Sequence, residues 1–304
     1  MQSVTGRIHE ITQPKGGFVN PSLFKVEKLD NCSKELAYKE NLHSSVIGMA
    51  VDYLTRYMIT GDKQDAFAIS LMGAMSAYHS GVKDAAPMAV NLIDGLDGLT
   101  DQSIINACKL VTYDVWYRCP TRAPQAKPAV ATMPDKATIE NVRTMVERSL
   151  RFFDTYGPIV EDGFTFEPEG KEDDYEKWRW NGTTDFGGYT RTVSGGDGDF
   201  LTYNTLWDFK VSKTKPTAVH TLQLLMYWIM GQHSGRSVFK SIETLGIYNP
   251  RLNTTYRLDV NMIHDGIIRE VESEVIRYNK PASHDNICEN PFLNALMKGI
   301  MSAD

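Results

Sequence analysis

The sequence has no long apolar run and few cysteines. No stretch of about 18 apolar residues occurs, and the first residues lack the apolar centre of a signal peptide, so we expect a cytoplasmic protein without a membrane span. The four cysteines are widely and unevenly spaced, which indicates neither a zinc-binding pair nor a disulfide framework. They are Cys32, Cys108, Cys119 and Cys288. With 304 residues, 42% of them hydrophobic and 23% charged, the composition predicts a folded globular protein rather than a disordered chain.

Positive charge is in the minority. The chain has 32 Lys and Arg against 38 Asp and Glu, a formal net charge of −6, which argues against non-specific coating of nucleic acid. The charge is unevenly distributed, however. Eight acids fall within residues 161–176, a segment that we expect to point away from any nucleic acid or to gate access to it, whereas Lys210, Lys213 and Lys215 lie close together. The net charge therefore averages two different regions.

The part of the chain before residue 158 has mainly helical patterning. Apolar residues recur at three- and four-residue steps, with Thr100 as an expected N-cap. The first 30 residues mix Pro, Gly and polar residues and are expected to form an extended arm. Four prolines interrupt regular structure over residues 118–134. Helices are predicted over residues 46–58, 65–78, 84–100, 100–118 and 135–157.

After residue 157 the pattern changes to short β-rich runs. A helix from Thr217 to Gly231 interrupts them, and an amphipathic helix over 265–278 follows. The charged residues 167–188 are expected to form a long exposed hairpin loop. Meandering strands followed by a crossover helix and a further strand predict a mixed sheet with one parallel pair. The predicted strands are 164–167, 189–193, 199–203, 205–212, 242–249 and 254–260.

One predicted strand brings an acid and a lysine together. Because side chains alternate along a strand, Asp208 and Lys210 share one face while Trp207 and Phe209 face the other. A carboxylate there can bind a divalent cation, with the ammonium beside a water that the cation activates. Asp199 can supply a second carboxylate, because the segments on either side of the turn at residues 203–204 should pair as a hairpin.

The helix that follows adds two polar side chains. Gln223 and Tyr227 are four residues apart and therefore lie on one helical face. Leu222, Leu225, Met226 and Ile229 occupy a neighbouring face. We therefore expect Gln223 and Tyr227 to border the site as hydrogen-bonding groups.

These residues form an ordered set of motifs. GxxD at 196–199, DxK at 208–210 and QxxxY at 223–227 together resemble the PD-(D/E)XK nuclease superfamily, and the QxxxY element resembles the RecB-type nucleases of CRISPR adaptation and recombinational repair. The order is what makes the resemblance specific. The lone match at Glu169-Gly170-Lys171 lies in a charged loop without a strand.

The resemblance covers roughly residues 160–260 and implies an α/β (α+β) fold. Its core would be a restriction-endonuclease-like mixed β-sheet flanked by helices, with a large N-terminal helical portion. Residues 1–157 would be mainly helical and contribute one core helix, while residues 158–304 would form the nuclease core. We expect the two to make one compact unit.

The resemblance also implies roles for the motif residues. Asp199 and Asp208 would bind Mg²⁺ or Mn²⁺, with the backbone carbonyl of Phe209 as a third ligand. Lys210 would position or polarise the attacking water. Gln223 and Tyr227 would help to hold the metal site and the substrate backbone.

RecB-type members carry a further histidine or glutamate after a glycine on an N-terminal helix. The nearest match here is Gly48 followed by Asp52, which departs from that pattern and makes Asp52 a further candidate ligand. His43 is a second candidate for the role. An ion pair between Asp52 and Arg56, four residues on, is the alternative structural interpretation. Some relatives bind an iron-sulfur cluster through late cysteines, and with only Cys288 in that region none is expected.

Further residues near the site are candidates for substrate contacts. Lys213 and Lys215 would touch phosphates or only solubilise the loop, and His220 opens the predicted helix beside the site. Trp178 and Trp180 would stack on bases or, as we expect, anchor their loop.

We therefore predict a divalent-metal-dependent nuclease that acts on DNA, as in a phage, a defence system or repair. One alternative is a nuclease-fold binding or assembly protein with weak or no catalysis. Another is a hydrolase of RNA or another phosphodiester. Residues 35–118 contain no evident DNA-reading motif, and we hypothesise that they contact a protein partner or a second copy of the chain.

Overall fold

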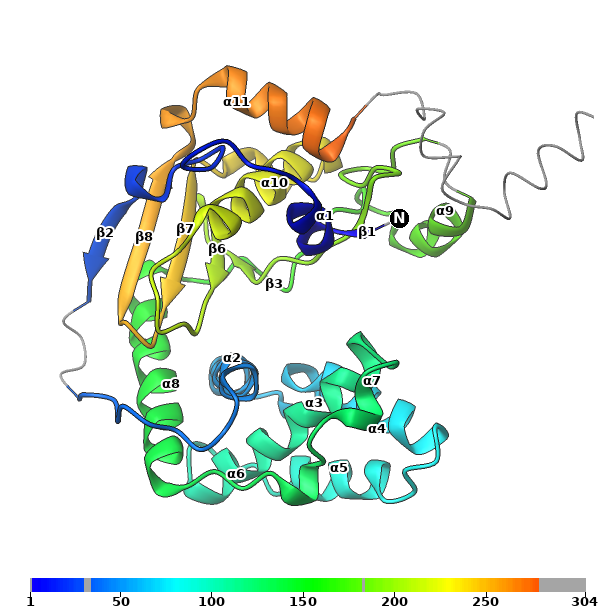
Figure 1. Ribbon diagram of the computed structural model, residues 1–304, viewed down its shortest axis with the longest axis vertical. Coiled ribbons are helices and arrows are strands. Elements are labelled where there is room, and N and C mark those ends of the chain that lie inside the picture. Colours follow the sequence, from blue (N-terminus) through cyan, green and yellow to red (C-terminus); the bar gives the residue numbers. More distant parts are fainter. Residues whose placement is uncertain (1, 30–33, 182–183, 279–304) are drawn as a thin grey trace, which may run out of the picture.

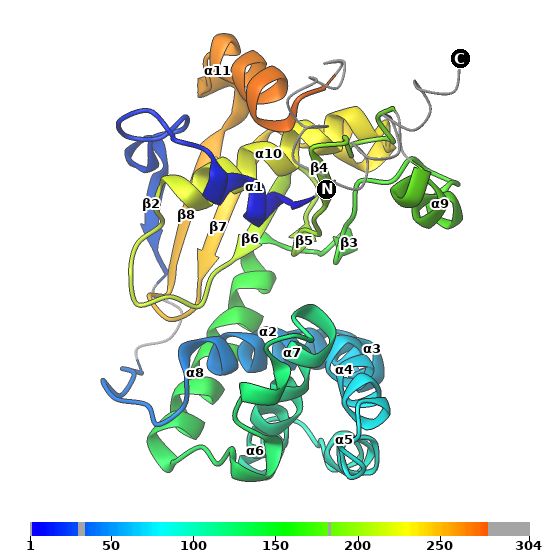
Figure 2. The ribbon, with the colours of Figure 1, turned by 45° about the vertical axis from the view of Figure 1, so that its right-hand side comes forward.

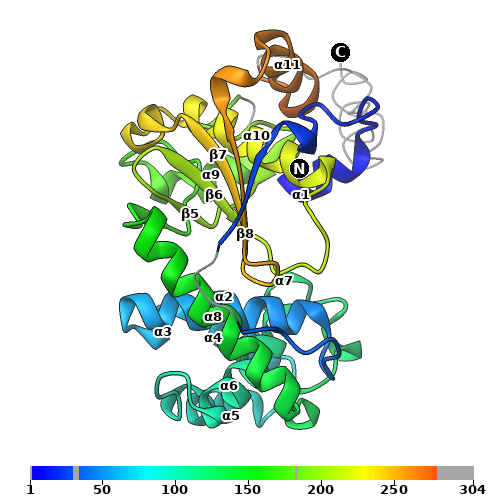
Figure 3. The ribbon, with the colours of Figure 1, turned by 90° about the vertical axis from the view of Figure 1, so that its left-hand side faces the viewer.

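The computed structural model describes residues 2–29, 34–181 and 184–278. A sheet-bearing half and a helical half lie one above the other, and α8 (Lys136–Tyr156) extends from one to the other (Figure 1). Figure 3 shows α8 running diagonally from the sheet past α2 (Ser44–Thr60). Within the described residues, no helix combines the length and apolarity needed to cross a membrane.

The main sheet is mixed, as predicted. Its strand order is β2-β8-β7-β6-β5-β3, and β6 and β7 are parallel while the other neighbours are antiparallel. The parallel pair is joined by α10 (Ala218–Ser234), which is the predicted crossover helix. The strands are β2 (Lys25–Lys28), β3 (Glu161–Asp162), β5 (Phe200–Leu201), β6 (Thr205–Phe209), β7 (Thr244–Asn249) and β8 (Thr254–Asp259).

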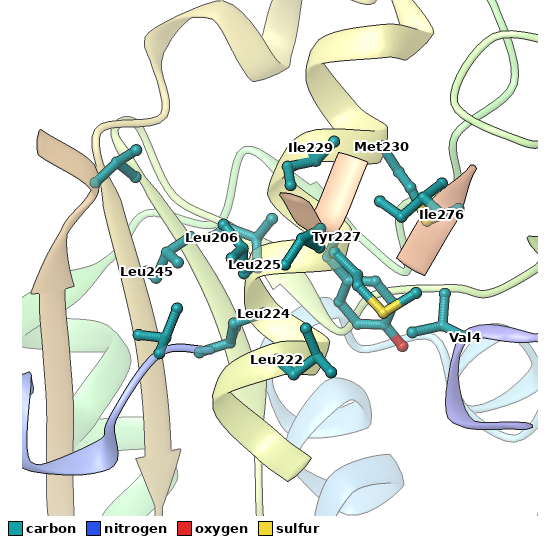
Figure 4. Close-up of a cluster of buried hydrophobic side chains, with 14 of the residues drawn as sticks. Val4, Leu206, Leu222, Leu224, Leu225, Tyr227, Ile229, Met230, Leu245 and Ile276 are labelled. Atoms are coloured by element: carbon teal, nitrogen blue, oxygen red, sulfur yellow. The ribbon is translucent and has the colours of Figure 1, made fainter. Parts of the chain in front are cut away.

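Both faces of the sheet are covered by helices. On one face α10 buries Leu222 and Leu225 with Leu206 and Leu245 of the strands (Figure 4). On the other face the Phe152 ring of α8 stacks on that of Tyr248, with centroids 4.0 Å apart, and meets Trp207 edge-on at 4.9 Å. Because β6 is central, its side chains are buried on both sides.

The helical half agrees with the periodicity of residues 35–118. Thr100 caps α6 as predicted, since its hydroxyl accepts the Ser103 N–H at 3.2 Å. The proline-rich residues 118–134 contain only short 3₁₀ turns, and α8 ends at Gly157 as expected. The helices here are α2, α3 (Lys63–Ala66), α4 (Ala68–His79), α5 (Ala85–Asp94), α6 (Asp101–Leu110) and α7 (Asp114–Arg118).

The expectation of an extended N-terminal arm was wrong. Residues 4–10 form α1 (Val4–Glu10), and β2 pairs with β8 at the edge of the sheet. α1 packs against α10, with Val4 and Ile8 buried in the same core. Two apolar residues on a seven-residue helix give too little periodicity to detect, so the helix depends on this long-range packing.

The first two predicted strands were misplaced. Residues 164–167 do not form a strand: Phe164 and Phe166 are both buried, as alternation predicts, but their carbonyls accept hydrogen bonds from the loop residues Gly198 at 2.8 Å and Gly188 at 2.9 Å rather than from a paired strand. The second run is shifted to β4 (Val193–Gly195), which pairs in parallel with β1 (Gln2–Ser3) outside the main sheet. The edge strand next to β5 in the main sheet is instead β3.

Three other boundaries differ from the prediction. The expected loop over 167–188 contains a helix, α9 (Tyr175–Asn181). The last amphipathic segment is α11 (Asp265–Glu270) followed by a π-helical turn. α10 continues past Gly231 to Ser234, because Gly231 makes room for the Phe239 ring and Gly235, with φ of 74°, is the left-handed cap.

The two halves do not correspond to two consecutive parts of the chain. Residues before 158 supply α1, β1, β2 and α8 to the sheet-bearing half, which Figure 2 shows from a second direction. The division of the chain at residue 157 stays a prediction.

Candidate active site

Asp208 and Lys210 lie together at the end of β6. The Lys210 Nζ is 2.8 Å from Asp208 Oδ1, and the Asp208 side chain is only 3% exposed. Asp208 Oδ2 is buried and has no hydrogen-bond partner among the described residues. Leaving a buried oxygen without a partner costs about 1–3 kcal/mol. This atom is therefore the natural place for a ligand that the protein itself does not supply.

Asp199 is brought beside this pair by the expected hairpin. β5 and β6 pair antiparallel with Phe200 opposite Trp207, and Asp199 Oδ2 accepts the backbone N–H of Phe209 at 2.5 Å. Gly198 is needed for this approach, since a Cβ there would lie 1.9 Å from the Phe164 ring. The carbonyl of Phe209 as a metal ligand stays a prediction.

Asp52 approaches from the helical half. A Cβ at Gly48 would lie 3.8 Å from Val211, so this turn of α2 lies against the residue that follows Lys210. One turn later, Asp52 Oδ1 accepts a hydrogen bond from Arg56 Nε at 2.9 Å. The structural ion pair is thereby confirmed, and the metal role of Asp52 remains a prediction.

Asp52, Asp199 and Asp208 are hereafter the acid cluster. Burial raises the pKa of Asp208 to about 6, against the opposing charge of Lys210 and with a contribution from Asp199. Burial likewise raises the pKa of Asp52 to about 6, with Arg56 opposing and Asp199 adding to the rise. The Asp52 side chain keeps 27% exposure, so solvent screens part of this effect. The three carboxyls therefore share one electrostatic environment.

Lys210 remains cationic in this environment. Burial opposes its charge, but Asp208 and Asp199 outweigh burial and raise the pKa of the Lys210 ammonium. At neutral pH the group is therefore a hydrogen-bond donor and a positive charge rather than a base.

Two further charged groups lie at the site, and the sequence predicted neither of them as a site residue. Arg56 also forms an ion pair with Asp162 of β3 and reaches the backbone carbonyl of Asp199 at 3.5 Å. Burial raises the pKa of Asp162, and Arg56 opposes this. Asp162 therefore lies beside the acid cluster rather than pointing away from it, and the alternative expectation, that the acidic segment gates access, stays a prediction. The four-residue spacing from Asp52 identified Arg56 only as an ion-pair partner, and nothing local identified Asp162.

Gln223 and Tyr227 lie together on α10 as predicted. The Gln223 amide donates to the Tyr227 hydroxyl at 2.8 Å. Burial raises the pKa of Tyr227 against the effect of Gln223, and Asp208 and Asp199 add to the rise, so the hydroxyl stays protonated. Figure 4 shows the Tyr227 hydroxyl directed toward Val4 of α1. The phenol is close enough to the acid cluster to respond to its charge.

The predicted substrate contacts are in three different situations. His220 Nδ1 accepts the Thr217 N–H at 2.9 Å, and burial followed by the charge of Lys210 lowers the His220 pKa, so a neutral imidazole lies near Lys210. Lys213 already contacts the chain, 3.8 Å from Glu40 and 3.3 Å from the Tyr38 carbonyl. Lys215 is exposed and has no hydrogen bond or ion pair within the described residues.

The remaining candidates lie away from the acid cluster or belong to their own segment. His43 is the exposed N-cap of α2, about 13 Å along the helix axis from Asp52, so it is not brought to the site. Trp178 anchors its segment as expected, donating to the Thr184 carbonyl at 2.8 Å, whereas Trp180 is 82% exposed. Cys108 and Cys119 are free, and Cys32 and Cys288 lie outside the described residues.

The chemistry of the site fits a small cation held by few protein ligands. In residues 2–29, 34–181 and 184–278, no group of three or more His, Cys, Asp and Glu side chains is arranged to hold a metal ion. Mg²⁺, however, is commonly bound through one or two carboxylates and keeps several waters. Asp199 and Asp208 fit this kind of site, because Oδ2 of Asp208 has no hydrogen-bond partner among the described residues. Asp52 fits it less well, because its carboxylate already accepts a hydrogen bond from Arg56. Comparison with protein-family models, with curated proteins and with solved structures finds no match.

Proposed function

We propose that the chain is a divalent-metal-dependent nuclease of restriction-endonuclease-like fold that hydrolyses phosphodiester bonds, with DNA as the expected substrate. The observation that carries the proposal is the ion pair between the buried Asp208 and the partly exposed Lys210 at the end of β6. The Asp199 carboxylate accepts a hydrogen bond from the backbone N–H of Phe209, which lies between Asp208 and Lys210. The parallel pair of strands and the polar face of α10 agree with the motif order that led to the proposal.

Asp199 and Asp208 would hold Mg²⁺ or Mn²⁺, with Asp208 Oδ2 as the oxygen available for it. The bound cation would supply positive charge that stabilises the negative charge on the phosphate during cleavage. Both carboxyl groups come from one hairpin, which fixes their spacing before substrate binds. This pre-organisation is what electrostatic catalysis requires.

Lys210 would act as a charge and a hydrogen-bond donor. Its raised pKa keeps the proton on the ammonium, so we assign it to orienting the attacking water and stabilising the phosphate rather than to removing a proton. The Asp208 ion pair fixes the ammonium in place. Tyr227 would donate a hydrogen bond toward the same region, because its oxygen already accepts from Gln223.

The first test is cleavage by the purified chain with Mg²⁺ or Mn²⁺. Linear, circular and single-stranded DNA, RNA and small phosphodiesters are offered in parallel. Asp208→Ala and Lys210→Ala are each expected to reduce the rate by at least about 100-fold, since each removes a preorganised charge. Lys171→Ala is the matched control, because its lysine belongs to the lone Glu169-Gly170-Lys171 match and is exposed. Cleavage that survives in both site variants contradicts the proposal.

A second measurement separates catalysis from binding. Calorimetric titration with Mg²⁺ and Mn²⁺ should show binding to the wild-type chain and its loss in Asp199→Ala. Absence of cleavage, together with metal binding that is missing or indifferent to Asp199, would favour the binding or assembly protein instead.

A further inference from the structure

The helical half contains a buried carboxylate that the proposed reaction does not use. Asp114, the first residue of α7, is 1% exposed. Its two oxygens accept hydrogen bonds from the hydroxyls of Tyr53 and Ser70, each at 2.6 Å. Its hydrogen-bonding needs are therefore met without a cation.

Arg118 lies one helical turn after Asp114 and contacts both the Asp114 carboxylate and the Tyr53 hydroxyl. Its Nε is 3.8 Å from Asp114 Oδ2, an ion pair without a hydrogen bond, and one terminal nitrogen donates to the Tyr53 hydroxyl at 3.4 Å. That is the one hydrogen bond its guanidinium makes to the described chain. The side chain is 47% exposed, so most of its five N–H donors have no partner within the described residues.

Arg118 is related to the acid cluster by chain position and by charge. Its partner Tyr53 is next to Asp52 on α2. Burial opposes the charge of Arg118, but Tyr53, Asp197 and Asp114 outweigh it and raise its pKa. Asp197 is the exposed residue two before Asp199 in the sheet-bearing half. Figures 1 and 2 both show α7 on the side of the helical half that faces the end of the sheet with β3 and β5.

We propose that Arg118 is a phosphate-binding residue supplied by the helical half, so that the substrate backbone runs between α7 and the acid cluster. A guanidinium donates two parallel hydrogen bonds to a phosphate. The Asp114 anchor reduces the rotamer entropy lost on binding, and phosphate oxygens would replace Asp197 as the facing negative charge. This inference rests on the proposed function and adds a contact opposite the chemistry.

The binding test uses the full chain carrying Asp208→Asn, which is expected not to cleave. A labelled DNA of 20 nucleotides, single-stranded and as duplex, is titrated by fluorescence anisotropy in Mg²⁺ at several salt concentrations. Arg118→Ala is expected to weaken binding about tenfold and to reduce the slope of log affinity against log salt by about 0.9 for duplex. Arg118→Lys should keep the slope and recover only part of the affinity, because lysine cannot form the paired hydrogen bonds.

Arg122→Ala is the matched control. Arg122 is four residues further along the chain, beyond the end of α7, is exposed, and has no side-chain hydrogen bond or ion pair within the described residues. It should bind within about twofold of the parent. In chains with Asp208 intact, Arg118→Ala should raise KM for cleavage with kcat little changed, which loss of the local fold would not do selectively. Thermal unfolding of each variant checks the fold, and Arg118→Gln replaces Arg118→Ala if that variant unfolds.

The two proposals fail in different ways. If the wild-type chain cleaves DNA and Arg118→Ala matches Arg122→Ala in affinity and salt slope, the inference is overturned and the nuclease stands. If the wild-type chain neither binds nor cleaves any nucleic acid, the nuclease and the inference are both overturned.

Discussion

Asp114 illustrates how burial and hydrogen bonding compete at one residue. Burial raises its pKa, while the hydrogen bonds from Ser70 and Tyr53 and the charge of Arg118 lower it, and burial prevails. The folded state therefore binds the Asp114 proton more tightly than the unfolded state, whose carboxyl titrates near about 3.9. The contribution of this group to stability is fully present below that pH and is lost as pH rises through the raised pKa.

The raised pKa of Asp114 predicts how the stability of Asp114→Asn changes with pH. The amide cannot titrate, so the free energy of unfolding of the variant should improve relative to the wild type as pH rises from about 4 toward 7. Other carboxyls, including those of the acid cluster, titrate in both proteins and cancel in the difference. Urea unfolding at a series of pH values measures it. A difference that stays constant with pH would show that burial does not govern this carboxyl.

At the scale of elements, the local sequence pattern predicted helices and strands correctly where the segments that pack or pair together are close in sequence. The β5–β6 hairpin, the crossover helix and the 3.6-residue periodicity of α2 each depend on neighbours within about 20 residues, and all were predicted. β1, β3 and β4 are two or three residues long, so no alternation develops in them. Their pairing is decided by distant segments that no local pattern identifies.

The same distinction applies to the candidate site. Asp199, Asp208, Lys210, Gln223 and Tyr227 lie within one continuous stretch, and their grouping followed from strand and helix periodicity. The Arg56–Asp162 pair joins residues 106 apart in sequence, and the Arg118–Tyr53 contact joins residues 65 apart. Such contacts require the arrangement of the halves, which sequence periodicity does not contain.

Gly231 provides a prediction at the scale of one element. A Cβ at this position in α10 would lie 2.4 Å from the Phe239 ring. Gly231→Ala should therefore lower the free energy of unfolding by about 1–3 kcal/mol through overpacking, although alanine favours helix by about 1 kcal/mol.

A double-mutant cycle with Phe239→Ala tests the cause of that loss. The pair should be less destabilising than the sum of the single variants, because removing the ring makes room for the methyl group. Denaturant unfolding of the four proteins provides the cycle. Strict additivity would mean that Gly231 is not required for close packing.

At the scale of the whole molecule, the acid cluster contains residues from both halves. The chain passes between these halves several times. Asp52 comes from the helical half and the other two acids from the sheet-bearing half. A buried ion pair between Glu40 and Arg251, at 2.8 Å, ties the segment before α2 to the turn between β7 and β8. Phe209 and Val211, at the end of β6, pack against the helical core. The site geometry therefore depends on the contact between the halves.

This dependence predicts the behaviour of residues 158–304 expressed alone. That fragment lacks the edge strand β2 and α1, whose Val4 and Ile8 belong to the core around α10. It also lacks Phe152, which covers Trp207 and Tyr248 on the other face of the sheet. Each buried apolar side chain of this size contributes about 1.5–3 kcal/mol, so losing Val4, Ile8 and Phe152 alone removes about 4.5–9 kcal/mol, which is comparable with the roughly 5–15 kcal/mol that stabilises a typical domain.

We therefore expect the fragment to show no cooperative thermal transition and no near-ultraviolet circular dichroism signal from packed aromatic rings. Co-expression with residues 1–157 as a separate chain is the matched control, because it restores the missing elements without the covalent link. The two pieces should co-purify and regain both signals. A cooperative transition of the fragment alone, near the melting temperature of the full chain, would instead identify residue 157 as the boundary of an independently folding domain and would assign the N-terminal residues to binding rather than to support of the sheet.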